Sequence, residues 1–271
     1  MSDPRTELFD THCHLFERGF HGRYGFMLRA QGDELAAYER FRDEFTITRS
    51  LVVGYEEPNR YRGNTDYIVG LSAQRDWIVP LRFVSADRAI RRGDAVSIYA
   101  GDAVGAEMAA ATLDAADASG ATPSIVSLNA VPEALQLLAP TIRRLENTWF
   151  LISHLGLPGP VDSAPDARAR LTPVLALADV SHVSVKLSGQ YAASVGGYPH
   201  DDAQVIVDVV ADAFGTAQLV WGSDFSPCLE YVSFDEAIHC LLPRGVNPQE
   251  RAQILSGNAT RMFTHYHGAA A

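Results

Sequence analysis

Two histidines stand one residue apart in the first apolar segment of the sequence, within Asp-Thr-His-Cys-His-Leu-Phe at residues 10–16. Alternate side chains of an extended strand share a face, so Asp10, His12 and His14 would point to one side and Cys13 to the other. A lone strand histidine is more often a core residue, but a His-x-His pair joined by further polar groups is typical of a metal or catalytic site. The segment therefore predicts the first part of such a site.

Polar residues that can do chemistry also end three other apolar segments. His154 closes Trp-Phe-Leu-Ile-Ser-His, and Asp224 follows Leu-Val-Trp-Gly-Ser. Ser184, Lys186 and Ser188 alternate with valine and leucine in a third segment, which predicts that they share its polar face. Lys186 is the only lysine among 22 basic residues, and its position at a strand end indicates a need for a compact, flexible ammonium group.

The elements that must position these residues alternate along the whole chain. Apolar runs bounded by turn residues predict strands at 8–15, 48–55, 78–84, 95–100, 124–128, 148–154, 183–187 and 218–223. Amphipathic stretches predict helices at 33–45, 64–74, 105–119, 132–145, 166–178, 201–214, 235–242 and 247–263. Only the stretch 85–94, after the third strand, shows no full helix.

This alternation predicts the fold. Eight strands that alternate with helices, without a linker, repeat or change of composition, predict an α/β protein with one domain over residues 1–271, a single (β/α)8 TIM barrel slightly distorted after strand three. A doubly wound sheet would call for a glycine-rich phosphate turn after the first strand, and the sequence has none. Because chemistry in such barrels lies at the C-terminal ends of the strands, we expect the polar residues above to meet there.

Composition limits the classes of partner. The net charge is −11 and no stretch gathers lysine or arginine into a stripe, which argues against nucleic acid and anionic membrane surfaces. Three cysteines without Cys-x-x-Cys spacing predict reduced thiols. No signal peptide or long apolar run is recognisable, so we expect a cytoplasmic protein with a small-molecule substrate. The sequence does not determine the oligomeric state, and a homo-oligomer is one of the possibilities.

Five segments in order resemble one known family. They are DTHCHLF, ISHLGLP, VKLSGQY, WGSDFSP and LSGNATRMF, and they extend from residue 8 to residue 263. Together they resemble the amidohydrolase-2 branch of the amidohydrolase superfamily, and HLGLP and VKLSG are most similar to its lactonase group, which includes fuconolactonase and 2-pyrone-4,6-dicarboxylate lactonase. The resemblance implies that His12, His14, His154 and Asp224 form the core of the active site, with Lys186 beside them.

The resemblance leaves metal dependence open. Three neutral imidazoles and a carboxylate, from His12, His14, His154 and Asp224, would hold one divalent ion such as zinc or manganese. Members of the lactonase group are also known that work without metal. A second metal is not expected, because strands four and five offer serine, tyrosine and asparagine where members with two metals have a bridging ligand and a histidine.

The sequence favours a hydrolase that acts on a small lactone or cyclic ester by water attack. Asp224 is expected to be the general base, with His154 and Lys186 polarising the substrate. Tyr191, Trp221 and Ser188 lie next to the motifs and are candidate substrate contacts, and Arg82 is the nearest candidate for a carboxylate contact.

Two alternatives to a hydrolase and one question about a loop remain open at this point. The first is a metal-dependent decarboxylase of a small unsaturated or aromatic acid, which the same family includes. The second is a barrel that keeps the site only as a binding pocket. The loop at 16–31 is the third open question, because it can be a lid over the site or a surface excursion.

Overall fold

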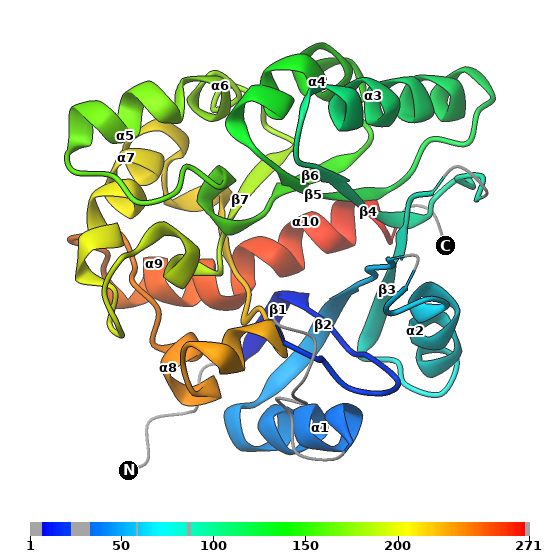
Figure 1. Ribbon diagram of the computed structural model, residues 1–271, viewed down its shortest axis with the longest axis horizontal. Helices are drawn as coiled ribbons and strands as arrows, with labels where there is room; N and C mark the ends of the chain where they lie inside the picture. Colours follow the sequence, from blue (N-terminus) through cyan, green and yellow to red (C-terminus); the bar gives the residue numbers. More distant parts are fainter. Residues whose placement is uncertain (1–6, 23–32, 58, 86–87, 269–271) are drawn as a thin grey trace.

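The computed structural model describes residues 7–22, 33–57, 59–85 and 88–268. Eight parallel strands form one sheet in the order of the sequence, as drawn in Figure 1. Their bounds are β1 Leu8–Cys13, β2 Ile47–Val53, β3 Ile78–Phe83, β4 Ala95–Ala100, β5 Ile125–Ala130, β6 Trp149–Ile152, β7 Val183–Leu187 and β8 Leu219–Trp221. The sheet curls into a nearly closed barrel, so the predicted (β/α)8 architecture is confirmed.

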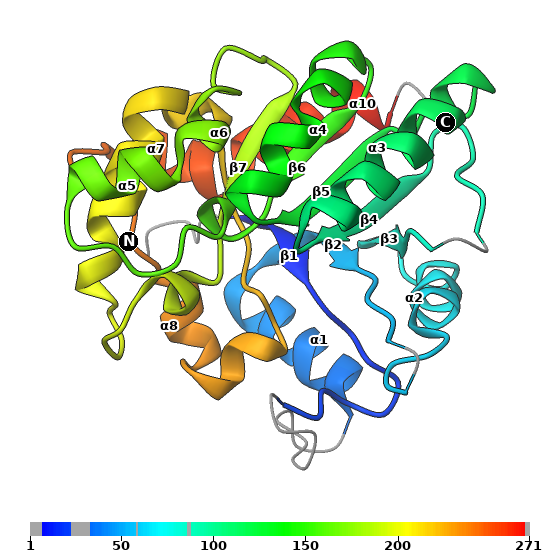
Figure 2. The same cartoon turned by 45° about the horizontal axis from the view of Figure 1, so that its top comes forward.

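Helices cover the outside of the barrel, as the two ribbon views show (Figure 2). They are α1 Glu34–Phe45, α2 Asn64–Ser72, α3 Ala103–Ala118, α4 Pro132–Arg144, α5 Ala164–Arg170, α6 Thr172–Leu175, α7 Gln204–Phe214, α8 Phe234–Ile238, α9 Pro248–Ala252 and α10 Asn258–Tyr266. Among the described residues between β3 and β4 there is no helix, which confirms the predicted distortion. None of the helices in the described ranges is long and apolar enough to span a bilayer.

Side-chain caps explain where several helices begin. Asp33 accepts a hydrogen bond from the backbone N–H of Ala36 and so starts α1. Asn247 accepts from two backbone N–H groups at the start of α9, and Glu250 bonds back to the N–H of Asn247. These side chains satisfy N–H groups that have no partner within the helix. The predicted helix at 247–263 is α9 and α10 joined by a π-helical turn, Gln253–Gly257.

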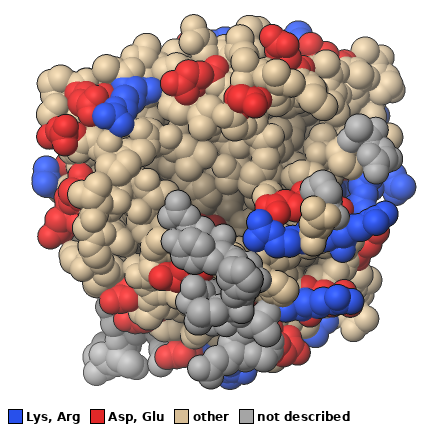
Figure 3. Space-filling model, viewed as in Figure 1, with Lys and Arg blue, Asp and Glu red and all other residues tan. Residues whose placement is uncertain are grey.

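Alternation along the strands divides the core into two layers. The outward side chains of β4 to β7 pack against the helices, whereas the opposite face fills the barrel interior with an apolar cluster that includes Leu51, Leu81, Ile125, Trp149 and Leu151. Since successive inward positions are two residues apart, the positions beyond this cluster reach the C-terminal end of the barrel. The face of the molecule drawn in Figure 1 is hollowed at its centre (Figure 3).

The barrel closes between β1 and the segment that follows β8. The backbone N–H of Asp224 donates to the carbonyl of His12 at 2.7 Å, and Cys13 and Phe225 form a parallel bridge. Thr11 adds a side-chain hydrogen bond to the carbonyl of Trp221 at 2.6 Å. This seam places the His-x-His segment directly beside Asp224, although the two lie at opposite ends of the sequence.

Candidate active site

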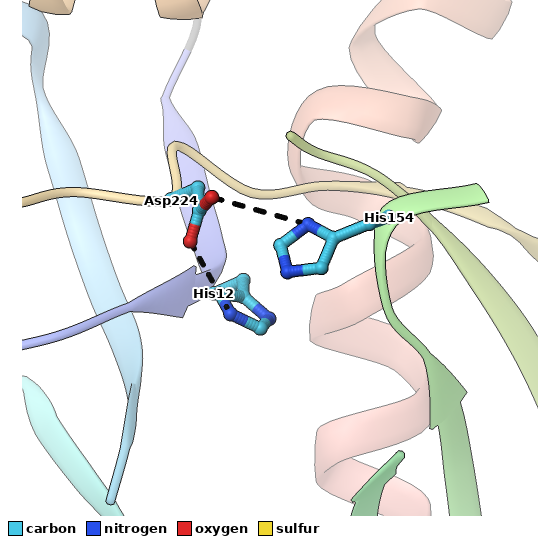
Figure 4. Close-up of side chains that lie close together, drawn as sticks. All are labelled: His12, His154 and Asp224. Carbon is cyan, nitrogen blue, oxygen red and sulfur yellow. Dashed lines mark ion pairs between the residues drawn. The ribbon is translucent and has the colours of Figure 1, made fainter. Parts of the chain in front are cut away.

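Three histidines and one aspartate from three parts of the barrel converge at the C-terminal ends of its strands. His12 Nε2 lies 3.2 Å from His14 Nε2 and 3.5 Å from Asp224 Oδ1. His14 Nε2 lies 3.7 Å from Asp224 Oδ1, and His154 Nδ1 lies 4.0 Å from Asp224 Oδ2. Figure 4 shows His12, His154 and Asp224 pointing toward one another. The structure therefore brings together the four residues that the sequence motifs singled out.

Neighbouring groups decide which nitrogen of His14 carries its proton. His14 Nδ1 lies 2.8 Å from the carbonyl oxygen of Val53, which only accepts, so Nδ1 donates. Burial lowers the pKa of His14 to about 4, and the ring is neutral near pH 7. A neutral ring that donates from Nδ1 keeps a lone pair on Nε2, directed at His12 and Asp224. Metal-binding histidines are commonly oriented in this way.

Lys186 lies below the histidines, inside the barrel. Its side chain is completely buried, and Nζ contacts His12 Nδ1 at 3.1 Å and donates to Ser127 Oγ at 2.7 Å. Burial lowers the pKa of Lys186 to about 7. As predicted, Lys186 points into the barrel, but its partner there is His12. The lysine therefore contacts the imidazole of His12 from inside the barrel.

Asp224 is the carboxylate at the centre of the cluster. Tyr191 donates a hydrogen bond to Oδ2, which leaves Oδ1 directed at His12 and His14. Burial raises the pKa of Asp224 to about 6, against the opposing effect of His14. A carboxylate with this pKa is mostly ionised at pH 7 and still accepts a proton readily.

The backbone around the site adopts conformations that side chains rarely take. His154, with φ of 53°, and Asp224, with φ of 57°, both occupy the left-handed region. Such residues cost about 1–3 kcal/mol each and cluster at functional sites. Gly189 is also left-handed, and a Cβ there would lie 2.3 Å from His154 Nδ1. The glycine of the VKLSG motif thus leaves room for His154.

Asp10 supports the candidate site, and the sequence patterns gave it no role. It is fully buried, and Oδ1 accepts hydrogen bonds from the backbone N–H groups of His12, at 3.0 Å, and Ser223, at 2.9 Å. Oδ2 accepts from Ser223 Oγ at 2.6 Å and from Tyr38 at 2.7 Å. One carboxylate therefore links the His-x-His segment to the residue before Asp224. The available signal was its place in the DTHCH motif.

Two of the four predicted substrate contacts are at the site and two are elsewhere. Ser188 Oγ lies 3.1 Å from His154 Nδ1, and Tyr191 contacts Asp224. Arg82, by contrast, pairs with Asp94, which precedes β4, so its guanidinium is directed away from the strand ends. Trp221 is fully buried against the helices and donates to the carbonyl of Ala237. Much of the loop at 16–31, which the sequence leaves open as a lid or a surface excursion, lies outside the described residues.

Three of the four site residues fit one divalent ion, because His12, His154 and Asp224 have ligand atoms that all lie within 4.8 Å of one another, and His14 lies beside them. Ligand atoms around a tetrahedral zinc ion, about 2.0–2.1 Å from the metal, lie about 3.3 Å from one another. The nitrogen and oxygen atoms of His12, His14 and Asp224 are 3.2 to 3.7 Å apart, and His154 Nδ1 lies 4.0 Å from the carboxylate. Neutral imidazoles and a carboxylate suit zinc or manganese. The same side chains can also satisfy one another by hydrogen bonds without an ion. His12 Nε2–H can donate to His14 while Lys186 donates to His12 Nδ1.

Solved structures with the same fold include amidohydrolases and a probable hydrolase of a pyrone dicarboxylic acid. A zinc-bound amidohydrolase from Burkholderia multivorans superposes with a TM-score of 0.74 at 20% identity, covering 96% of this chain and 99% of that one. A probable 2-pyrone-4,6-dicarboxylic acid hydrolase from Acinetobacter baumannii, with bound citric acid, gives 0.70 at 19% identity over 95% and 99% of the two chains. At these identities the likeness shows the fold.

Sequence comparison adds family membership. L-fucono-1,5-lactonase of Burkholderia multivorans is 32% identical over 127 residues, a match that spans 42% of this chain and only 43% of the lactonase. The family model described as amidohydrolase matches residues 96–264, more than half of the chain and including His154, Lys186 and Asp224. The chain belongs to the amidohydrolase family.

Proposed function

We propose that this protein hydrolyses a small lactone or cyclic ester by water attack, with Asp224 as the general base. The observation that carries the proposal is the position of the Asp224 carboxylate, buried among imidazoles from two other strand ends and held by Tyr191. Its pKa of about 6 suits proton transfer near neutral pH. The partial similarity to L-fucono-1,5-lactonase supports a lactone as substrate.

The reaction needs one proton to move twice. Asp224 takes a proton from water as the water oxygen adds to the lactone carbonyl carbon. The ring C–O bond then breaks, and the leaving alkoxide recovers the proton from Asp224. His154, whose side chain is 10% exposed, lies nearest to the open end and faces the oxygen on which negative charge develops. Lys186 keeps His12 in place through the contact between Nζ and Nδ1.

We propose that one divalent ion, zinc or manganese, is held by His12, His14, His154 and Asp224. When bound there, the ion would supply Lewis acidity beside the carbonyl. Ser153 Oγ, at 3.3 Å from His12 Nδ1, offers the acceptor that a ligating His12 needs on its other nitrogen.

The test replaces the carboxylate and measures hydrolysis. Saturated and unsaturated lactones are assayed by pH-stat, which detects the acid released from any ring. We expect Asp224→Asn to lower kcat by about 10²–10⁴-fold, the usual contribution of a general base. Asp162→Asn, an exposed aspartate outside the site, is the matched control and should turn over normally. Normal hydrolysis by a folded Asp224→Asn variant would refute the mechanism.

The same assays can be extended to distinguish the decarboxylase alternative from lactone hydrolysis. Unsaturated and aromatic carboxylic acids are added, and released CO₂ is measured. CO₂ release without hydrolysis of any lactone would assign the site to decarboxylation instead.

A further inference from the structure

A second buried carboxyl group lies outside the barrel, at the start of α1. Glu34 is only 2% exposed, and a buried carboxyl group needs hydrogen-bond donors or a cation around it. Its oxygens accept from three donors: the backbone N–H groups of Phe16, at 2.9 Å, and Phe20, and the hydroxyl of Ser226, at 2.7 Å. None of these donors belongs to α1, whose N-cap is Asp33. The side chain of Glu34 therefore holds segments other than its own helix.

The three donors belong to the segments that follow β1 and β8. Phe16 comes two residues after His14, and Ser226 comes two residues after Asp224. One carboxyl group thus joins the two segments just beyond the residues of the candidate site. Asp10 joins the same two segments just ahead of those residues. The two buried carboxyl groups therefore hold the segments together on both sides of the site.

Phe16 links Glu34 to the imidazole of His14. The ring of Phe16 stacks on that of His14, with centroids 5.7 Å apart and an interplanar angle of 5°. His14 also donates from Nδ1 to the carbonyl oxygen of Val53, at 2.8 Å. One hydrogen bond and one aromatic neighbour therefore orient this imidazole, and Glu34 holds the backbone of the aromatic neighbour.

Ser226 links Glu34 to the segment that carries Asp224. This segment is irregular, because Asp224 has a left-handed backbone with φ of 57°. The backbone N–H of His14 donates to the carbonyl of Phe225, and the fully buried Ser226 donates its hydroxyl to Glu34. A left-handed residue persists only where its surroundings hold it, so these contacts help to keep Asp224 directed at the histidines.

A carboxyl group suits these three donors and an amide does not. Each carboxyl oxygen has two lone pairs, so Oε2 accepts from Phe16 while Oε1 accepts from Phe20 and Ser226. A glutamine in place of Glu34 would set its NH₂ group against one of the two backbone N–H groups, in either orientation of the amide. A buried N–H group without an acceptor is unfavourable, so the segment after β1 would have to shift.

We propose that Glu34 is a positioning residue that sets the geometry of His14 and Asp224 through Phe16 and Ser226. Its hydrogen bonds go to neighbours of the two site residues and not to the site residues themselves. The effect on turnover rests on the proposed function, because Asp224 is the proposed base. The effect on the orientation of His14 can be measured without any reaction.

The first experiment measures lactone hydrolysis in Glu34→Gln. We expect kcat to fall by about tenfold to 100-fold while KM changes less than about threefold, because the base is misdirected and the substrate contacts remain. Asp43→Asn makes the same change from carboxylate to amide at an exposed position of α1 and should behave as wild type. A wild-type kcat in Glu34→Gln would overturn the proposal.

A second variant covers the case in which Glu34→Gln does not fold. Ser226→Ala removes only the contact with the segment after β8 and leaves the N–H groups of Phe16 and Phe20 paired. We expect its kcat to fall by about twofold to tenfold, less than in Glu34→Gln, because only one of the two links is lost. A wild-type kcat in Ser226→Ala would equally overturn the proposal.

The third experiment measures the orientation of His14 and needs no substrate. The ring of Phe16 shifts the NMR signals of the His14 imidazole, so these signals report how the two rings lie, and they are assigned by their loss in His14→Ala. In Glu34→Gln we expect them to shift or broaden. The signals of His182, whose Nε2 lies 2.8 Å from the carbonyl oxygen of Ile142 outside the site, should stay in place. A mere loss of stability would move neither set, and unchanged His14 signals would overturn the proposal.

The kinetic and NMR measurements together separate failure of this inference from failure of the proposed function. Displaced His14 signals in Glu34→Gln, in a protein that hydrolyses no lactone, would retain the positioning role and reject lactone hydrolysis. Lactone hydrolysis that is equal in wild type and Glu34→Gln, with unchanged His14 signals, would reject the positioning role alone.

Discussion

Replacing Asp10 tests whether one buried carboxylate holds the two halves of the site together. Asp10 accepts four hydrogen bonds, two from backbone N–H groups of His12 and Ser223 and two from hydroxyl groups. In Asp10→Ala all four donors lose their acceptor. The hydroxyl of Tyr38 can turn to Ser50, which lies 2.8 Å away, but among the described residues the two backbone N–H groups donate only to Asp10.

The structure sets the size of the effect. Each buried N–H left without an acceptor costs about 1–3 kcal/mol, so the two together lower the free energy of unfolding by about 2–6 kcal/mol. A domain is stable by only about 5–15 kcal/mol. In Asp10→Asn, Oδ1 still accepts from both N–H groups, and the two hydroxyls can reverse to accept from the new amide. We therefore expect the asparagine variant to lose less than about 2 kcal/mol.

Urea unfolding followed by tryptophan fluorescence measures both variants, because Trp149 and Trp221 are fully buried. The value of kcat is also measured without urea, where both variants are folded. A purely structural role for Asp10 would leave this kcat unchanged. We expect kcat to fall further in Asp10→Ala than in Asp10→Asn, with a smaller change in KM, since only the alanine variant loses the hydrogen bonds that hold His12 and Ser223 in place. A free energy of unfolding for Asp10→Ala within about 1 kcal/mol of the wild-type value would refute the reasoning.

Three further predictions concern the glycine, the metal and a buried glutamate. Gly189→Ala should lower kcat/KM by about 10²-fold or more, because its Cβ would displace His154, whereas Gly197→Ala, with no atom within 4 Å of the new Cβ, should be neutral in the same assay. Protein purified without chelator or affinity tag should contain close to one zinc or manganese per chain by elemental analysis, and His14→Ala should lower that ratio severalfold; a folded, active and metal-free protein would contradict it. Burial raises the pKa of Glu34 above its ordinary 4.5, so its protonation favours the folded state and that stability is lost as the pH rises through the raised pKa. The difference in free energy of unfolding between wild type and Glu34→Gln should thus fall from pH 4.5 toward neutral, and a flat difference in urea titrations would count against it.

Local patterns in the sequence determined the architecture and the strand ends at which the candidate site lies. Strand alternation placed Lys186 on the inward face, and the alternation of strands with helices predicted the barrel. His12 and His14 also turn toward the site, but β1 is irregular in register between Asp10 and Cys13, and Phe9 of the same strand lies in the interior cluster. Those patterns repeat over two to four residues and depend on backbone geometry alone, which is why they could be read without a structure. The departures are local as well: the helix predicted at 166–178 is two helices, α5 and α6, and the one at 235–242 shortens to Phe234–Ile238.

Only the tertiary structure decided which of these residues touch. Asp10 and Ser223 are 213 positions apart, and their hydrogen bond exists because the barrel closes between β1 and β8. Arg82 and Trp221 were placed near the site from sequence proximity, but the first pairs with Asp94 and the second packs against the helices. Contacts between distant segments follow from closure of the sheet, and no local period in the sequence encodes them.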